Sequence, residues 1–296
     1  MFYFILISGT MILFFLILLV YFYFYPSKGI QRIRQLERVK KEYINQIHGP
    51  KRIIVGGSDV LYSFNTDKMN RELAVPTVNL GTNVGLGMGY LLDFAREYLK
   101  SGDEVIICPA YSLYYKRPYD IFAYEYYRMY DRKKLKIFTL KEQIYFLLAN
   151  MKLNLAYVQK QFNLSDSGAY IDVKGTVLDE KKNRPLKFPR KFEETESIQN
   201  LLDFNEYCLK NQINVKLTFP STLYFSEYMN SRYLQELVQY LSVEFDCIGK
   251  PESYYVPKSK IYNSVYHVNE VGQSLRTRNL IAYLKIEEVN YGSKHL

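Results

Sequence analysis

Residues 50–108 alternate short apolar runs with segments of helical character, and this alternation limits the fold more than any other feature of the chain. Strands are predicted over 53–55, 77–80 and 104–108. Helices are predicted between them, and a fourth strand is predicted at 215–219. Strand–helix–strand repeats indicate a parallel sheet with crossover helices. We therefore predict an α/β fold: a three-layer α/β/α sandwich with about five parallel strands and a site at their carboxyl ends.

The first 26 residues are predicted to form a transmembrane anchor. Phe2 to Tyr25 contains no charged side chain. As a helix this run is about 36 Å long, enough to cross a bilayer core of about 30 Å with some tilt. A cleaved signal peptide fits less well, because no basic region precedes the run and no small-residue cleavage site follows it.

The segment that follows, residues 27–50, is predicted to be a basic juxtamembrane linker helix. Its basic residues outnumber its acids, Glu37 and Glu42; they include Lys28, Arg32, Arg34, Arg38, Lys40 and Lys41. The positive-inside rule then places the rest of the chain in the cytoplasm. The function inferred below favours the opposite side of the membrane, and we expect an extracytoplasmic domain. The net charge of +9 accompanies no nucleic-acid motif, so membrane lipid, and not nucleic acid, is the expected partner of these charges.

Residues 51–296 are predicted to form one domain with a lid-like polar insertion near 160–195. Further helices are predicted over 119–157, 197–211, 232–244 and 271–286. The three cysteines show no metal-binding spacing. Cys108 ends an apolar strand and is read as a core thiol, while a Cys208–Cys247 disulfide is left open.

Two separated segments carry candidate chemistry. The run 53–58 predicts a strand ending in a Gly-Gly turn that presents Ser58, and His267 stands in a turn before the last helix. A serine hydroxyl becomes nucleophilic when histidine takes its proton. The structural alternative is that Ser58 only caps a helix. The glycine-rich loop 81–89 lacks the lysine of a P-loop, so it is either a tight turn or a source of backbone N–H groups for an oxyanion.

Taken in order, these segments resemble the SGNH/GDSL hydrolase superfamily, and in particular its membrane-anchored members from bacterial envelope and surface-polysaccharide clusters. The matching motifs span about residues 50–285 and are Gly56-Gly57-Ser58, Val78-Asn79-Leu80-Gly81, Gly102-Asp103, Pro109-x-Tyr111 and Tyr266-His267-x-Asn269-x-x-Gly272. The resemblance implies that Ser58 is the nucleophile, that His267 is the base, and that the N–H groups of Ser58 and Gly81 bind the oxyanion.

The chain departs from the family pattern at two places. Asn263 stands where an acid should orient His267; it can accept a hydrogen bond but adds no negative charge. The family's third-block asparagine is not evident, and Asn83 is a candidate replacement donor. Asp59, Tyr111 and Tyr114 are the candidate substrate-binding residues, although a tyrosine-rich composition also explains the two tyrosines.

The resemblance implies a membrane-anchored acyl esterase or O-acyltransferase that acts on an envelope or surface saccharide. It implies no cofactor and no metal, and it implies an acylated saccharide or other ester as substrate, with envelope or polysaccharide-assembly proteins as further partners. Two alternatives stay open: a catalytically weak or inactive SGNH-fold protein that binds glycan or partner proteins, and an unrelated α/β protein.

Overall fold

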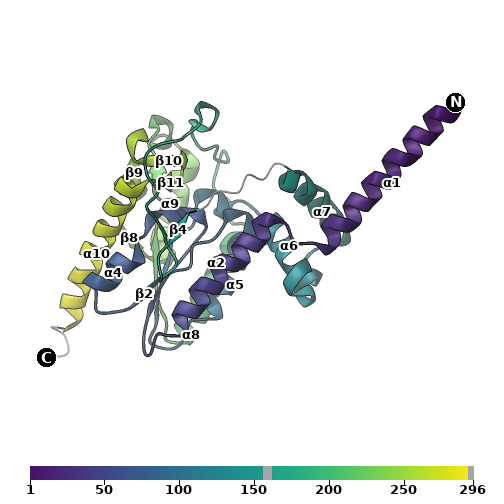
Figure 1. The fold of residues 1–296 in the computed structure, drawn as a ribbon. Coiled ribbons are helices and arrows are strands. Elements are labelled where there is room, and N and C mark those ends of the chain that lie inside the picture. The colour runs from purple at the N-terminus through teal and green to yellow at the C-terminus, as the bar shows by residue number, and fades with distance from the viewer. Residues whose placement is uncertain (156–161, 293–296) are drawn as a thin grey trace.

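The computed structural model describes residues 1–155 and 162–292 (Figure 1). Parts of two predicted segments, residues 156–157 of the helix at 119–157 and residues 160–161 of the lid, lie outside the described residues. The fold is α/β, as predicted. Its helices α1 to α10 span Phe2–Phe24, Lys28–Ile44, Ser58–Ser63, Thr66–Glu72, Met88–Arg96, Ile121–Tyr130, Leu140–Leu155, Glu196–Lys210, Arg232–Glu244 and Glu270–Gly292.

Five parallel strands form the central sheet, in the order β2-β1-β3-β6-β8. In chain order they are β1 (Arg52–Val55), β2 (Thr77–Asn79), β3 (Glu104–Ile107), β6 (Asn214–Thr218) and β8 (Asp246–Ile248). All four pairings are parallel. The sheet grows in opposite directions on the two sides of β1, so a crevice is expected at the carboxyl ends of β1 and β3.

Alternate residues of the strands pack into two different cores. Ile53, Val55, Val105 and Ile107 join a large cluster that includes α5, α8 and α9. Ile54 and Ile106 join a smaller cluster with α3, α4 and α10. This period-two alternation is what a sheet covered on both faces requires, and it explains why the strands read as continuous apolar runs.

Within the part of the chain that the structure describes, three two-stranded sheets lie outside the central one. They are β4 (Asn163–Leu164) with β5 (Tyr170–Ile171), β7 (Thr222–Leu223) with β9 (Tyr255–Val256), and β10 (Ile261–Ser264) with β11 (His267–Val268). The first of these falls in the predicted insertion, so the described part of that insertion contains a short hairpin as well as loop.

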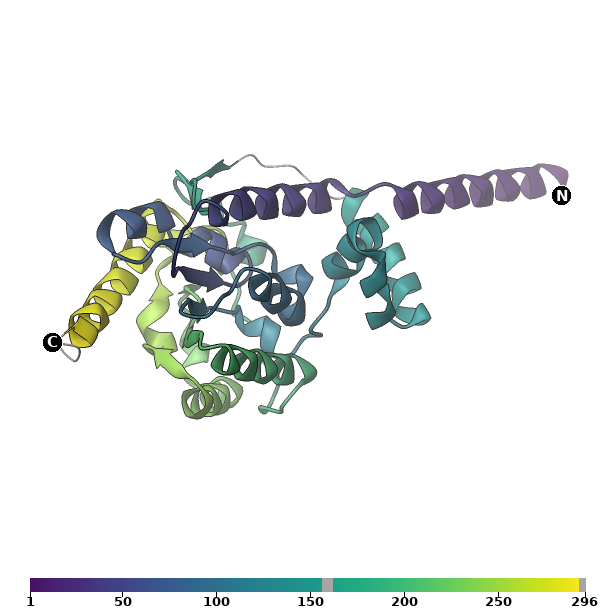
Figure 2. The same cartoon turned by 90° about the horizontal axis from the view of Figure 1, so that it is seen from below.

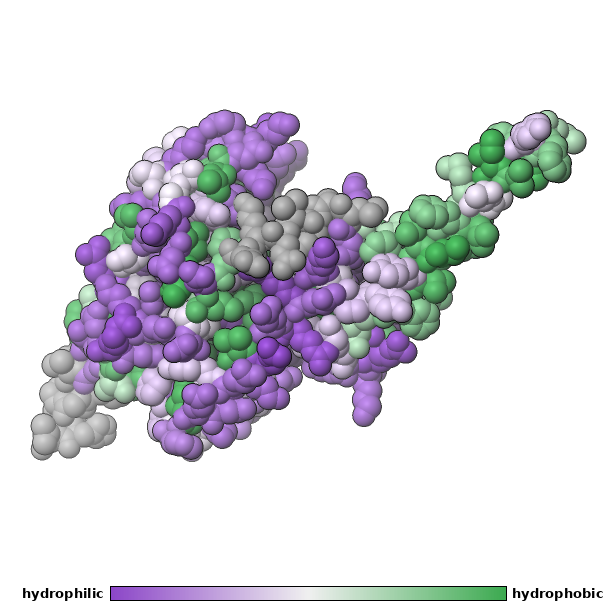
Figure 3. Space-filling model, in the orientation of Figure 1, coloured by the Kyte–Doolittle hydropathy of each residue, from purple (hydrophilic) through white to green (hydrophobic). Residues whose placement is uncertain are grey.

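The N-terminal helix α1 is long and apolar enough to span a membrane. It projects away from the rest of the molecule, and its surface is hydrophobic (Figures 1 and 3). It ends at Phe24, and Tyr25 is extended because Pro26 follows.

Helix α2, expected to be a linker, packs against the body of the molecule. Ser27 caps its N-terminus by accepting a hydrogen bond from the N–H of Ile30 at 3.1 Å. Ile30, Ile33 and Leu36 are buried at i, i+3 and i+6, so one face of the helix belongs to the core. Figure 2 shows α2 lying along the body while α1 extends beyond it.

Candidate functional site

Ser58 lies where β1 turns into α3. Gly56 and Gly57 form this turn, and a Cβ at Gly56 would meet the backbone carbonyl of Cys108 and the side chain of Val60. The chain therefore passes too close to the neighbouring loop for any larger residue at that position. The turn places Ser58, which is partly exposed, at the carboxyl end of β1.

His267 is presented by the β10–β11 hairpin, in which it pairs with Ser264. Asn269 follows it and caps α10, its side-chain oxygen accepting hydrogen bonds from the N–H groups of Val271 and Gly272 at 3.2 Å each. A Cβ at Gly272 would contact Val268 and the carbonyl of Lys260. The Asn and Gly that follow His267 in the sequence motif therefore serve to seat the hairpin on the helix.

Ser58, His267 and Asn263 come together in one hydrogen-bonded chain. Ser58 Oγ lies 2.9 Å from His267 Nε2, and Asn263 Oδ1 lies 2.7 Å from His267 Nδ1. An amide oxygen can only accept, so Nδ1 donates to Asn263. Nε2 is then unprotonated and accepts the hydrogen bond from Ser58. This is the tautomer in which His267 can act as a base for the Ser58 hydroxyl.

Burial controls the basicity of His267. Desolvation, with a smaller contribution from the charge of Lys182, lowers the pKa of His267 to about 3. A carboxylate at position 263 would oppose this shift, but Asn263 carries no charge. The imidazole is therefore neutral at physiological pH, and it is a weak base.

An aromatic wall surrounds His267, and sequence reasoning did not find it. Tyr62 stacks on the imidazole, with ring centroids 4.2 Å apart and an angle of 6° between the planes. Tyr170 meets Tyr62 edge-on at 5.0 Å, and Phe162 does so at 5.6 Å. One signal was present: Tyr62 follows Ser58 by four residues, so the two share a face of α3.

A pocket of about 240 Å³ opens at Ser58 and His267. One side of it consists of Gly29, Arg32, Ile33 and Leu36 of α2. Arg32 Nε donates to Tyr170 Oη at 2.9 Å, and the guanidinium lies 5.4 Å from the centre of the Phe162 ring. The segment expected to be a linker thus forms part of the site, with a cation beside the aromatic wall.

Two of the three predicted oxyanion donors, Gly81 and Asn83, differ in their surroundings. The Gly81 N–H donates to Asn79 Oδ1 at 2.8 Å, so it is engaged inside the protein. Asn83 lines the pocket, and its Oδ1 accepts from the N–H of Gly85 at 2.8 Å. That bond fixes the amide and leaves the Asn83 NH₂ group to act as a donor. The geometry therefore favours Asn83 over Gly81 as the candidate oxyanion donor.

The three expected substrate-binding residues lie beneath the site instead of in it. Asp59, Tyr111 and Tyr114 are fully buried, and none of them lines the pocket at Ser58. Burial raises the pKa of the Asp59 carboxyl to about 7. Turned into the interior, these side chains are not in a position to contact a substrate.

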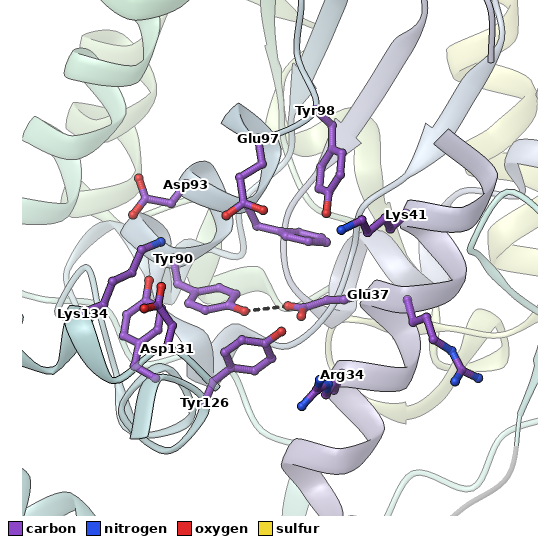
Figure 4. Close-up of a pocket in the computed structure, with 13 residues that line it drawn as sticks. Arg34, Glu37, Lys41, Tyr90, Asp93, Glu97, Tyr98, Tyr126, Asp131 and Lys134 are labelled. Carbon is purple, nitrogen blue, oxygen red and sulfur yellow. Dashed lines mark hydrogen bonds between the residues drawn. The ribbon is translucent and has the colours of Figure 1, made fainter. Parts of the chain in front are cut away.

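A second pocket, of about 340 Å³, lies between α2, α5 and α6 (Figure 4). Glu37 is buried at its wall and accepts a hydrogen bond from Tyr90 Oη at 2.8 Å. Desolvation raises the pKa of Glu37 to about 7. The lining mixes acids and bases, such as Asp93 and Lys41, but contains no serine, cysteine or histidine. Nucleophile and base occur together at the Ser58 pocket, which is the better candidate for an active site.

No group of three or more His, Cys, Asp or Glu side chains within residues 1–155 and 162–292 is arranged to hold a metal ion. Cys108, Cys208 and Cys247 are all free thiols, so the disulfide left open above is not formed. No protein-family model matches the chain, and no curated protein or solved structure matches it.

Proposed function

We propose that this chain is a membrane-anchored SGNH-type acyl esterase or O-acyltransferase that acts on an esterified saccharide of the cell envelope. One observation carries the proposal: a Ser–His–Asn chain with distances of 2.9 and 2.7 Å at the mouth of a pocket. These are hydrogen-bond distances between a nucleophile, a base and an orienting group. The helices on the two faces of the sheet are consistent with the three-layer α/β/α, flavodoxin-like sandwich of that superfamily.

The proposed reaction is acyl transfer in two halves. His267 Nε2 takes the Ser58 proton as Ser58 Oγ attacks the ester carbonyl, and the amide NH₂ of Asn83, with the N–H of Ser58, stabilises the oxyanion. The tetrahedral intermediate collapses, the alcohol leaves with the proton from His267, and an acyl-serine ester remains. Water or a sugar hydroxyl then attacks this ester, with His267 again acting as the base. As the second tetrahedral intermediate collapses, the bond to Ser58 Oγ breaks, His267 returns the proton to Ser58, and the free acid or the acylated sugar leaves.

The lining of the pocket supports a saccharide as substrate. Tyr62, Phe162 and Tyr170 present ring faces and edges, and Tyr62 and Tyr170 add hydroxyls. Sugar rings pack their C–H faces on such side chains, whose apolar body and polar tip suit them. We therefore also propose that the domain lies outside the cytoplasm, where an envelope saccharide is found.

A fluorophosphonate probe tests the nucleophile without knowledge of the natural substrate. The probe phosphonylates a serine that an adjacent base activates, and we expect it to label the peptide that contains Ser58. Ser58→Ala and His267→Ala should abolish labelling. Ser264→Ala, which removes a partly exposed hydroxyl next to Asn263, is the matched control and should leave labelling intact. Equal labelling of wild type and Ser58→Ala would refute the assignment.

Two observations favour a second candidate function, a binding protein on the same fold. His267 is oriented by an amide instead of a carboxylate, and the Gly81 N–H is engaged by Asn79. The missing carboxylate and the engaged N–H would both lower the rate of ester hydrolysis, and neither changes the shape of the pocket. A wild type that is not labelled by the probe but binds an envelope glycan would support this reading.

A further inference from the structure

Helix α7 carries an exposed apolar surface that the proposed chemistry does not use. Leu140, Ile144 and Leu148 recur every four residues and therefore share one face. Their exposed fractions are 74%, 54% and 41%. Ile137 and Tyr145, close to this face along the chain, are also exposed, and we call these five residues the α7 stripe. Soluble surfaces rarely leave a contiguous apolar patch of this kind uncovered.

The α7 stripe adjoins α1. Helix α7 packs against α1, and Figure 1 shows it beside the end of α1 that joins the body. Large apolar side chains are exposed along most of α1. If a bilayer covers α1, the same bilayer reaches α7, because the two helices pack against each other.

Contacts from α6 fix this arrangement. The Arg128 guanidinium donates to the backbone carbonyls of Phe22, at 2.7 Å, and Tyr23, so it caps the C-terminus of α1. Glu125 accepts from the N–H and hydroxyl of Ser27 at 2.7 and 3.1 Å. The α6–α7 unit is thus tied to both sides of the α1–α2 junction.

Charge around the stripe suits a lipid surface. Exposed lysines lie close to it along the chain, namely Lys133, Lys136, Lys141 and Lys152. Glu142, the only acid on α7, is paired with Arg117. Exposed apolar side chains with lysines among them suit a helix that contacts acyl chains and anionic headgroups at a membrane surface.

We propose that the segment 132–155 is a second membrane-contacting element, with the α7 stripe buried in the interface of the leaflet from which α1 emerges. Two attachments in place of one would hold the body at a set height and tilt. Arg32, at the Ser58 pocket, lies in the second turn of α2, only eight residues beyond the end of α1 at Phe24. The element would therefore hold the pocket close to the membrane surface.

The absence of tryptophan from the chain makes a direct test available. Single-tryptophan variants of the full-length protein are placed in nanodiscs of phosphatidylcholine and phosphatidylglycerol, with or without brominated acyl chains, which quench tryptophan on contact. Ile144→Trp probes the stripe and Phe14→Trp probes α1. Leu209→Trp is the matched control, since Leu209 is an apolar residue of α8 that is 66% exposed. Tyr145→Trp, an aromatic exchange at an exposed position, serves if Ile144→Trp does not fold.

We expect bromolipid to quench Ile144→Trp at least half as strongly as Phe14→Trp, with blue-shifted emission, and to leave Leu209→Trp unchanged. If Ile144→Trp and Tyr145→Trp both behave like Leu209→Trp, the stripe faces water and the proposal fails. Blue-shifted emission without quenching would mean that a protein or a second copy of the chain covers the stripe, which also refutes lipid contact. If bromolipid does not quench Phe14→Trp, α1 does not contact the bilayer, and the proposal fails.

Discussion

His267 is held at both ring nitrogens and on one face. Ser58 and Asn263 occupy the nitrogens, and Tyr62 covers the face. This orientation suits a base, yet Ser58, Asn263 and Tyr62 are all uncharged. With the pKa of His267 lowered to about 3 by burial, the imidazole stays neutral but has little driving force to accept a proton.

This low pKa predicts an unusual pH dependence. An ordinary Ser–His hydrolase loses kcat/KM below about pH 6.5, as its histidine is protonated. Here kcat/KM for a small ester should stay level from pH 7 down to about pH 5, because the pKa of His267 is near 3. Initial rates across this range test the point, and a half-maximal value near pH 6.5 would contradict it.

The same shift affects stability, with a definite sign. The folded pKa of His267 lies below the unfolded value, so the unfolded chain binds a proton that the folded chain rejects between pH 6.5 and about 3. This group therefore destabilises the fold as the pH falls through that window.

Tyr62 gives a second residue-scale prediction. Tyr62→Phe keeps the ring on His267 and should leave kcat for p-nitrophenyl acetate within about threefold. Tyr62→Leu removes the ring and should lower kcat about tenfold, or about 1.4 kcal/mol of barrier. An equal loss in both variants would instead assign the role to the Tyr62 hydroxyl.

At the residue scale, the sequence predicts that Ser58 and His267 lie together, but it does not predict the aromatic side chains around them. Ser58 and His267 could be predicted to meet, because one follows a strand and the other precedes the last helix of a parallel α/β pattern. Phe162 and Tyr170 could not, since they reach the pocket from a polar insertion whose docking depends on distant contacts. The buried positions of Tyr111 and Tyr114 are likewise set by tertiary packing.

Among the elements, α2 departs furthest from expectation. Its apolar spacing indicates one covered face, but the spacing does not reveal what covers it. Lys40 is fully buried and donates to the carbonyls of Asn79 at 2.6 Å and Gly168 at 2.5 Å. It therefore joins α2 to β2 and to the β4–β5 hairpin, and desolvation lowers its pKa to about 7.

The loop after β2 depends on Asn79. Its side chain donates to the carbonyls of Val60 and Phe64, at 3.0 Å each, and accepts from the Gly81 N–H. Asn79→Ala leaves these buried groups unpaired and should lower the free energy of unfolding by about 3 kcal/mol. Thermal unfolding in detergent measures this. Asn211→Ala, at an exposed helix end, is the control and should change stability by less than about 0.5 kcal/mol.

For the whole molecule, the alternating pattern was enough to predict a parallel α/β sheet, and the structure confirms that class. The fifth strand, Asp246–Ile248, is too short and too polar at its start to stand out. The order of the strands is set by long-range packing, which local patterns do not encode.

Membrane topology is the whole-molecule prediction. The basic residues after α1 favour a cytoplasmic domain, whereas an envelope substrate requires an external one. We expect alkaline phosphatase fused after Leu296 to be active, since this reporter folds only outside the cytoplasm. An inactive phosphatase fusion, together with a fluorescent cytoplasmic reporter at the same position, would place the domain in the cytoplasm and exclude an envelope substrate.

The most direct test of the Ser58–His267 assignment is to restore the missing carboxylate. In Asn263→Asp the carboxylate should hold the same tautomer, raise the pKa of His267 and stabilise the imidazolium that forms as Ser58 attacks. Hydrolysis of p-nitrophenyl acetate should rise about tenfold or more, which is about 1.4 kcal/mol of barrier. Adding Ser58→Ala should abolish both the basal and the raised rate. If Asn263→Asp lowers a Ser58-dependent rate, or if neither protein hydrolyses the ester, the catalytic account is contradicted.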